Sequence, residues 1–443
     1  MRSNGWSSPA FSGSDGMSPV RVALAAVALV LALGCAAAAA GAGGAPRLAL
    51  SWTAPPRFGV DANRDGLVDY PTTAAAVSPA RWPVDVRVRA GGGCPAARAS
   101  FRVDGATAPA RRTGRCVYRL QVRGLGRHRL AARVGAASGT TTATLRDLLV
   151  FGLGDSIASG EGSPDVPGTQ PRWEDARCDR SAKSFEAQSA LALERGDAHT
   201  TVTFVHLACA GASIDKGLLG SYGGINDPGG APLPPQVEQM RTLAGSRPID
   251  AVIISAGIND IGFSAIVRFC LAQAACMNAP YPDPSSTVTL NTFVAARIAA
   301  LPTRYAALQT ALGQAGVPAA RVVVTEYPDP TRDASGSTYC NPLLTVPGYG
   351  TVDAAEAAWA SQSFLAPLNA TVAQAAAQAG WRLAGGVASA FAPHGACSSA
   401  PWVVGLLESL RNQGSINGTL HPNPAGQRAI TGLVQPVLVA SLR

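Results

Sequence analysis

The sequence holds little charge, and lysine is almost missing from it. Charged residues make up 14% of its 443 positions, and Lys183 and Lys216 are its only lysines, so arginine carries nearly all of the positive charge. The formal net charge is +8. Because the arginines are scattered and no basic tract alternates with aromatic residues, the sequence disfavours nucleic-acid binding. Low charge together with 47% hydrophobic residues favours a folded globular chain over a disordered one.

Three motifs that would indicate other chemistry are also missing. No Cys-x-x-Cys pair occurs, which disfavours a metal cluster. No His-Glu-x-x-His segment occurs, which disfavours a zinc protease. No Gly-x-Ser-x-Gly segment occurs, which disfavours the nucleophile elbow of the α/β-hydrolase fold. The chemistry of this chain is expected to need no cofactor.

The sequence has one long apolar run, Val22 to Ala40, and no second run of that length follows it. Arg21 precedes this run, and the small residues 41–46 follow it. This order predicts a signal peptide with its cleavage zone. The run is also long enough to span a bilayer, so a retained membrane anchor is the alternative. Residues 1–45 are thus expected to direct the protein out of the cell or to fix it at the cell surface.

Cysteine usage supports export. Removing Cys35 with the leader leaves eight cysteines, an even number that favours disulfides in an exported chain. The sequence alone leaves the connectivity open. Since the cysteines fall into near neighbours, the hypothesis is sequential pairing: Cys94 with Cys116, Cys178 with Cys209, Cys270 with Cys276, and Cys340 with Cys397.

The pattern of elements changes near residue 148. Residues 46–147 hold short runs that alternate apolar and polar positions between Gly and Pro, which predicts a small Ig-like β-sandwich. From 148 to 443, apolar strand-like runs alternate with longer helical stretches, which predicts an α/β domain with a mostly parallel sheet covered on both faces. The expected strands are 148–153, 202–207, 251–255, 321–326 and 381–383, and the expected helices are 184–194, 235–243, 290–315, 352–379 and 425–440.

A loop within the predicted sandwich resembles the first half of a calcium site. Asp61, Asn63, Asp65 and Asp69 place oxygen ligands at alternate positions, with Gly66 sixth. The twelfth position is Thr72, whereas a calcium loop of this type carries a glutamate there that binds the ion through both oxygens. A metal-free turn is the alternative, since Asn and Asp form such bends unaided.

Three candidate site residues each follow a predicted strand of the α/β domain. Ser156 follows the first strand, Gly211 the second and Asn259 the third. Ligands of such sheets bind outside the carboxyl ends of the strands, so these residues are expected to meet on one rim. Ser156 is the nucleophile candidate, and its hydroxyl needs a base. Its own N–H, the Gly211 N–H and the Asn259 side chain are the candidate donors to an oxyanion.

The base must be one of five histidines. His421 lies in a loop that opens the last predicted helix and can reach the rim, so it is the preferred base. His394 is the competitor. His128 lies in the predicted sandwich, His206 lies inside a predicted buried strand, and His199 precedes that strand.

These residues resemble the sequence blocks of the SGNH, or GDSL, hydrolase family. Gly154-Asp155-Ser156 is similar to the first block, Gly211 and Asn259 match the glycine and asparagine blocks, and His421 matches the histidine block. The segment Gly-Asp-Ser-x-x-Ser-Gly-Glu-Gly is similar to secreted actinobacterial lipases and esterases. The resemblance covers about residues 148–443 and implies a three-layer α/β/α fold with esterase or lipase activity.

One position departs from that family. Its members usually carry Asp three residues before the histidine, and this chain has Gly418 there. By analogy with related enzymes that use a Ser–His dyad, the carbonyl of Thr419 is expected to accept from His421 Nδ1–H. The prediction is a His421-dependent enzyme without an essential Asp.

The expected function is hydrolysis of lipid or short-chain carboxylic esters by an exported monomer, with membrane or cell-surface association as a further expectation. Two alternatives stay open. One is deacetylation of a cell-wall or plant polysaccharide, and the other is a surface-binding protein with a silent hydrolase fold. Phe263, Ile261 and Tyr349 are candidate acyl-pocket residues, although core packing explains them as well.

Overall fold

The computed structural model describes residues 46–227, 229–282 and 288–443. Residues 45–443 form one compact unit. The predicted signal or anchor segment, residues 1–45, lies outside the described residues. Within the described ranges, no helix is both long enough and apolar enough to cross a membrane.

A parallel sheet forms the centre of the C-terminal region. Its strands run in the spatial order β14, β11, β10, β8, β9, and each neighbouring pair is parallel. All five strands predicted from the sequence are present; four shift by at most two residues at either end, whereas the strand predicted over 148–153 begins at Ala137. Their β-branched and apolar side chains are buried because both faces of the sheet are covered. The strands are β8 (Ala137–Gly154), β9 (Thr200–His206), β10 (Ala251–Ser255), β11 (Val322–Thr325) and β14 (Arg382–Ala384).

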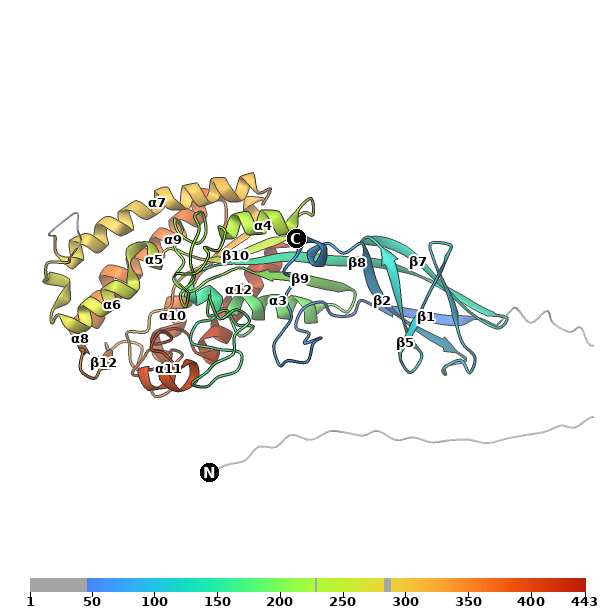
Figure 1. Ribbon diagram of the computed structural model, residues 1–443, viewed down its shortest axis with the longest axis horizontal. Helices are drawn as coiled ribbons and strands as arrows, with labels where there is room; N and C mark the ends of the chain where they lie inside the picture. The colour runs from blue at the N-terminus through green and yellow to red at the C-terminus, as the bar shows by residue number, and fades with distance from the viewer. Residues whose placement is uncertain (1–45, 228, 283–287) are drawn as a thin grey trace, which may run out of the picture. The chain divides into compact units, whose positions relative to one another are not determined.

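Helices cover both faces of this sheet, which gives the α/β architecture that the sequence predicts (Figure 1). One layer holds α3 (Phe185–Gly196) and α12 (Pro424–Ser441), which pack on each other. The opposite layer holds α4 (Gln236–Ala244), α7 (Leu290–Gln314) and α9 (Ala366–Ala379). The remaining helices lie around the strand ends: α1 (Ala74–Val77), α2 (Ser156–Ser159), α5 (Ile258–Ile261), α6 (Phe263–Ala272), α8 (Ala354–Trp359), α10 (Val387–Phe391) and α11 (Leu406–Gln413), with short 3-10 turns η1 (Cys276–Asn278), η2 (Ala319–Arg321) and η4 (Ala392–His394).

The helix predicted over 352–379 begins later and changes its winding. It consists of α8, a π-helical segment η3 (Ala360–Leu365) and α9. Pro367, the second residue of α9, has no N–H for an α-helical bond, which accounts for a local change in hydrogen bonding there. Helices α5 and α6 were not expected from the sequence.

Strand β8 crosses the predicted boundary between the two domains without a break. Its first half pairs antiparallel with β7 (Gly126–Val134), and its second half pairs with β9 and β10 in the parallel sheet. The other strands of residues 46–147 bury side chains in one core, whereas Phe58 and Val77, from the loop and helix α1 between β1 and β2, belong to the core of the parallel sheet. The Ig-like type and the division into domains stay predictions. These strands are β1 (Leu48–Thr53), β2 (Arg81–Ala90), β3 (Ser100–Val103), β4 (Ala106–Ala108), β5 (Arg111–Gly114) and β6 (Val117–Arg123), and a small hairpin, β12 (Leu344–Val346) with β13 (Gly350–Val352), lies in the C-terminal region.

Sequential disulfide pairing is confirmed. Four disulfides join Cys94 to Cys116, Cys178 to Cys209, Cys270 to Cys276, and Cys340 to Cys397. The second bridge ties the segment before Gly211 to the loop that follows α2.

Candidate active site

Ser156 lies at the tight turn where β8 ends and α2 begins. Gly154 takes a φ of +138°, and a Cβ at this position would lie 2.1 Å from the Ser255 carbonyl oxygen, so only glycine fits beside β10. The Asp155 side chain caps α2 by accepting from the Ile157 N–H at 3.0 Å. This turn fixes the Ser156 side chain at the carboxyl end of the sheet.

His421 lies in the loop between α11 and α12, and its Nε2 is 2.8 Å from Ser156 Oγ. The loop is held by a pair of backbone bonds with Val404, which accepts from Leu420 N–H and donates to the His421 carbonyl. Asn423 caps α12 by accepting from two N–H groups. The structure thus brings the predicted nucleophile and the predicted base within hydrogen-bonding distance.

Burial keeps the imidazole neutral. It lowers the pKa of His421 to about 4, while the nearby backbone carbonyls, that of Thr419 first, act in the opposite direction. A neutral ring can take the Ser156 proton at pH 7. The expected bond from Nδ1–H to the Thr419 carbonyl is not formed, because no group among the described residues meets hydrogen-bond geometry with Nδ1.

The space around Gly418 explains why no carboxylate stands there. A Cβ at residue 418 would lie 2.4 Å from Gln413 Oε1 and 3.0 Å from Ser409 Oγ. Gln413 is buried and its Oε1 accepts from the Gly162 N–H at 3.0 Å. The amide of Gln413 therefore fills the place that an Asp side chain at 418 would enter.

The three predicted oxyanion donors lie at the ends of neighbouring strands. Gly211 has a φ of +81°, and a Cβ there would come within 2.2 Å of the Tyr222 hydroxyl. Asn259 Nδ2 donates to the Ala212 carbonyl at 2.9 Å, which keeps its second N–H for a ligand. Within the described part of the chain, no hydrogen bond occupies the N–H of Ser156 or of Gly211. These three donors can serve an oxyanion without breaking a bond.

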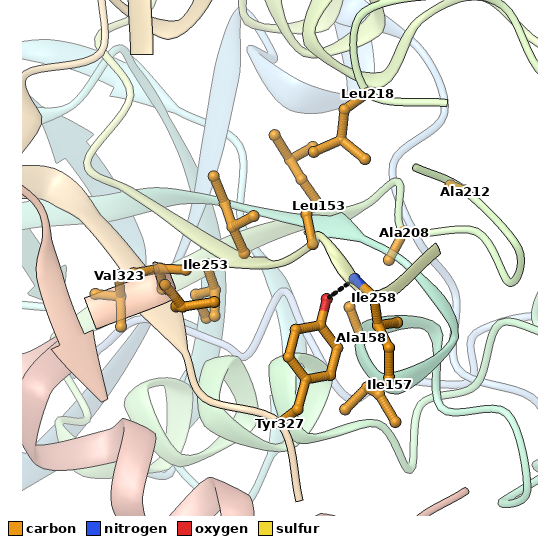
Figure 2. Close-up of a cluster of buried hydrophobic side chains, with 14 of the residues drawn as sticks. Leu153, Ile157, Ala158, Ala208, Ala212, Leu218, Ile253, Ile258, Val323 and Tyr327 are labelled. Carbon is orange, nitrogen blue, oxygen red and sulfur yellow. Dashed lines mark hydrogen bonds between the residues drawn. The ribbon is translucent and has the colours of Figure 1, made fainter. Parts of the chain in front are cut away.

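Tyr327, which the sequence did not single out, braces this rim. Its hydroxyl donates to Asp155 Oδ2 at 2.5 Å. It also accepts from the Ile258 N–H at 3.2 Å (Figure 2). Burial raises the pKa of Asp155 to about 7, and the bond from Tyr327 partly offsets that rise. Tyr327 thereby connects the turn of Ser156 with the segment that carries Asn259. Its place after a strand was a signal, but tyrosine alone does not indicate such a role.

An apolar cavity of about 80 Å³ opens beside Ser156 and His421. Phe263 lines it, as expected. Ile261 instead packs in the core, and Tyr349 is 76% exposed, so neither of these predicted pocket residues belongs to the wall. Most of the wall comes from α5, α6 and the segment 343–365, whose residues at the cavity are Ile258, Ile266, Val267, Leu343, Leu344, Trp359, Phe364 and Leu365.

The other four histidines are engaged elsewhere. His394 stacks on Trp402 with ring centroids 3.8 Å apart, so the competing base does not reach Ser156. His206 is buried and its Nδ1 lies 2.9 Å from Glu174. His128 pairs with an aspartate in the β-strand region, and His199 packs on a tryptophan near β9.

The loop proposed for calcium is closed by its own backbone. Asp61 accepts from the N–H groups of Asp65 and Gly66, and Asp69 accepts from the Ala62 N–H. Across the described ranges, no group of three or more His, Cys, Asp or Glu side chains is arranged to hold a metal ion. The turn alternative accounts for these bonds, and calcium binding by Asp61, Asn63, Asp65 and Asp69 stays a prediction.

Comparisons with known proteins agree with this geometry. The sequence profile of the GDSL-like Lipase/Acylhydrolase family matches residues 153–429. A lipase from Streptomyces rimosus is 26% identical over 306 residues, which cover 67% of this chain and 88% of the relative.

Two solved structures were also matched, both at low scores. A carbohydrate esterase has a TM-score of 0.30 at 14% identity, with 88% of this chain and 97% of the other covered. A carbohydrate acetylesterase from Xanthomonas citri has a TM-score of 0.29 at 12% identity, with 81% and 70% covered. Scores this low establish no relationship of fold or function.

Proposed function

Because this chain belongs to the GDSL-like lipase/acylhydrolase family, we propose that it is an exported serine esterase that cleaves carboxylic esters with an apolar acyl chain. The observation that carries the proposal is the 2.8 Å contact between Ser156 Oγ and His421 Nε2 at the mouth of an apolar cavity. A buried neutral imidazole beside a serine hydroxyl is the arrangement that nucleophilic catalysis requires.

The proposed reaction has two halves. In the first, His421 Nε2 takes the Ser156 proton while Oγ attacks the acyl carbonyl. The N–H groups of Ser156, Gly211 and Asn259 then hold the oxyanion. The protonated ring returns its proton to the departing alcohol as the ester bond breaks. In the second half, water repeats the attack on the acyl-enzyme and frees Ser156. Each step uses side chains and N–H groups of this chain alone, so the proposal includes no cofactor.

The cavity supports an acyl chain longer than acetyl as the preferred substrate. Each buried methylene contributes about 0.8 kcal/mol, so kcat/KM is expected to rise up to about fourfold per added methylene until the cavity is filled. An acetyl group would leave most of the apolar wall without a partner. Polysaccharide deacetylation, the alternative reaction of the same residues, is therefore the second candidate.

The test is a series of p-nitrophenyl esters from acetyl to dodecanoyl, with triglycerides, phospholipids and acetylated glycans beside it. The proposal predicts a maximum at a medium or long chain. It also predicts that Ile266→Trp, which fills the cavity, moves the maximum to shorter chains. Phe269→Trp is the matched control, since Phe269 lies on the same helix α6 but packs against Tyr281 and not on the cavity. A preference for acetylated glycans would favour the alternative, and a chain inert on every ester would favour a silent binding protein.

Export is part of the proposal. Four disulfides favour an oxidising compartment outside the cytosol. Whether the leader is cleaved or kept as a surface anchor is decided by the N-terminal residue of the protein recovered from the producing cell. A monomer in solution and contact with a membrane or cell surface also remain proposals.

A further inference from the structure

A buried carboxyl group lies beside the Ser–His pair, on the side of the imidazole that faces Ser156. Glu161 follows Gly160 in the turn after α2, and its N–H donates to the Ser156 carbonyl at 3.1 Å. Its Oε2 lies 3.6 Å from His421 Nε2, the same atom that contacts Ser156 Oγ. Its Oε1 is buried without a hydrogen-bond partner among the described residues.

The surroundings of Glu161 favour its neutral form in the resting site. Burial raises its pKa well above the ordinary value, and the nearby carboxylate of Asp179 raises it further. Gln413 opposes the rise with a hydrogen bond, and Asp155 adds to it. Tyr222, whose own pKa is raised to about 12, is the other titratable group that faces Glu161. Buried polar groups are normally hydrogen-bonded, so a carboxyl with an unpartnered oxygen next to the base calls for a functional account.

On the Nδ1 side of the imidazole, no carboxyl group of the described residues contacts the ring. His421 Nδ1 has no hydrogen-bond partner in the described part of the chain, and Gly418 stands where related enzymes carry Asp. Glu161 is the one acidic residue of the described ranges within 4 Å of the His421 ring nitrogens. An imidazolium formed in this buried place would meet a desolvation cost that the backbone carbonyls near Nδ1 offset only in part.

We propose that Glu161 is a positioning residue for acyl transfer, whose carboxyl supports the protonated His421 ring from the Nε2 side in place of an Asp at residue 418. This inference rests on the proposed function. When Ser156 Oγ–H gives its proton to Nε2, the new N–H lies between Ser156 Oγ and Glu161 Oε2. Glu161 Oε2 accepts a share of that hydrogen bond without gaining or losing a proton in the step, and it does so most strongly at a pH at which its carboxyl is already ionised. The proton on Nε2 then leaves with the alcohol, so Glu161 undergoes no net change.

The experiment compares Glu161→Gln with the wild type, measuring kcat, KM and the pH profile of kcat/KM from about pH 3.5 to about pH 8. Glutamine keeps the size and a polar oxygen but cannot ionise. Because its pKa is raised, Glu161 is protonated at low pH and supports the charged ring only at higher pH, where it ionises. The variant is therefore expected to lose about tenfold to a hundredfold in kcat/KM at about pH 8, and to lose the part of the rise in kcat/KM with pH that the ionisation of Glu161 produces in the wild type. A merely structural role would lower kcat/KM by the same factor at every pH.

The matched control is Glu186→Gln. Glu186 is also fully buried with unpartnered carboxyl oxygens, but it lies 3.6 Å from His206 and not from His421. The control is expected to keep the wild-type kcat/KM and its pH profile. If Glu161→Gln fails to fold, Glu161→Asp replaces it and is expected to keep the rise of kcat/KM with pH, since aspartate can still ionise.

The inference is overturned if Glu161→Gln keeps full kcat/KM at about pH 8, if it loses activity by the same factor at every pH, or if Glu161→Asp loses the rise of kcat/KM with pH. Ser156→Ala is measured beside these variants. Loss of activity in Ser156→Ala with an unchanged Glu161→Gln rejects this inference alone, whereas full activity in Ser156→Ala rejects the proposed function itself.

Discussion

His421 Nε2 lies 2.8 Å from Ser156 Oγ, although the two residues are 265 positions apart in the sequence. Ser156 is placed by the end of a central strand, and His421 by the loop that opens the last helix. The contact therefore depends on the packing of α12 against α3 and the sheet, which brings the two ends of the catalytic region together. The proposed chemistry follows from this one contact and the donors around it.

Asn259→Ala is expected to lower kcat by about a hundredfold to a thousandfold with little change in KM. The side chain donates to the oxyanion, which exists in the transition state and not in the bound ester. Steady-state kinetics on the best ester measures the split. Asn259→Asp, which keeps the size but replaces the donor with an acceptor, should be at least as slow. Wild-type kcat in either variant would remove Asn259 from the oxyanion site.

Gly418→Asp restores the residue that related enzymes carry, yet it is expected to lower the melting temperature without raising kcat. A Cβ at 418 meets Gln413 Oε1 at 2.4 Å, and moving Gln413 would leave the Gly162 N–H without its partner. Calorimetry and kinetics measure the two effects. Gly432→Asp is the control, because a Cβ there has open space. A faster Gly418→Asp enzyme with unchanged stability would show that this site accepts a conventional triad.

The free energy of unfolding is expected to fall as the pH rises from about 5 to about 8. Burial raises the pKa of Asp155 to about 7 and that of Asp260 to about 6, above their ordinary value of 3.8. Between the ordinary and the raised pKa values the folded chain binds more protons than the unfolded chain, so stability decreases with rising pH. His421, with its pKa lowered from 6.5 to about 4, acts in the opposite direction between those two values, but this one group offsets only part of the effect of the two carboxyls.

Melting temperatures across this pH range test the effect. Asp155→Asn, which keeps an acceptor for Tyr327 but cannot ionise, should flatten the dependence. A melting temperature that rises steadily from pH 5 to pH 8 would contradict the assignment of raised pKa values to these buried carboxyls.

Replacing Cys178 and Cys209 by serine is expected to cost roughly 3 to 4 kcal/mol of stability, from the 31-residue separation of the bridge. It should also lower kcat, because Cys209 precedes Gly211 by two residues and the bridge holds that turn. The control is the same change at Cys94 and Cys116, which should lower the melting temperature but leave kcat unaltered. Equal kcat in both double variants would show that the Cys178 bridge does not position Gly211.

The sequence predicted the rim because its residues follow recognisable strands. Ser156, Gly211 and Asn259 each come after an apolar run, and parallel strands end at one edge. His421 was preferred because its loop opens the last predicted helix and can reach the rim, and the block resemblance agrees with that choice. Local signals sufficed for these positions because each is defined by the strand or helix beside it.

Local sequence patterns could not predict the cavity or the groups that contact the imidazole. The wall combines α6 with the segment 343–365, and no local pattern states that the two meet. Tyr349 and Ile261 were candidate pocket residues, but Tyr349 is exposed and Ile261 is buried in the core. Whether such a side chain lines a cavity depends on the whole fold. The missing bond at His421 Nδ1, the amide of Gln413 that excludes Asp from residue 418, and the closeness of Glu161 likewise depend on side-chain packing over more than 200 positions.

The most direct test of the central claim is covalent labelling with an alkyl fluorophosphonate, followed by mass spectrometry of the digested protein. The proposed function predicts one labelled peptide, modified on Ser156 Oγ, and loss of that label in a folded His421→Ala variant. An unlabelled wild type, or a label on another serine with Ser156 untouched, would contradict it.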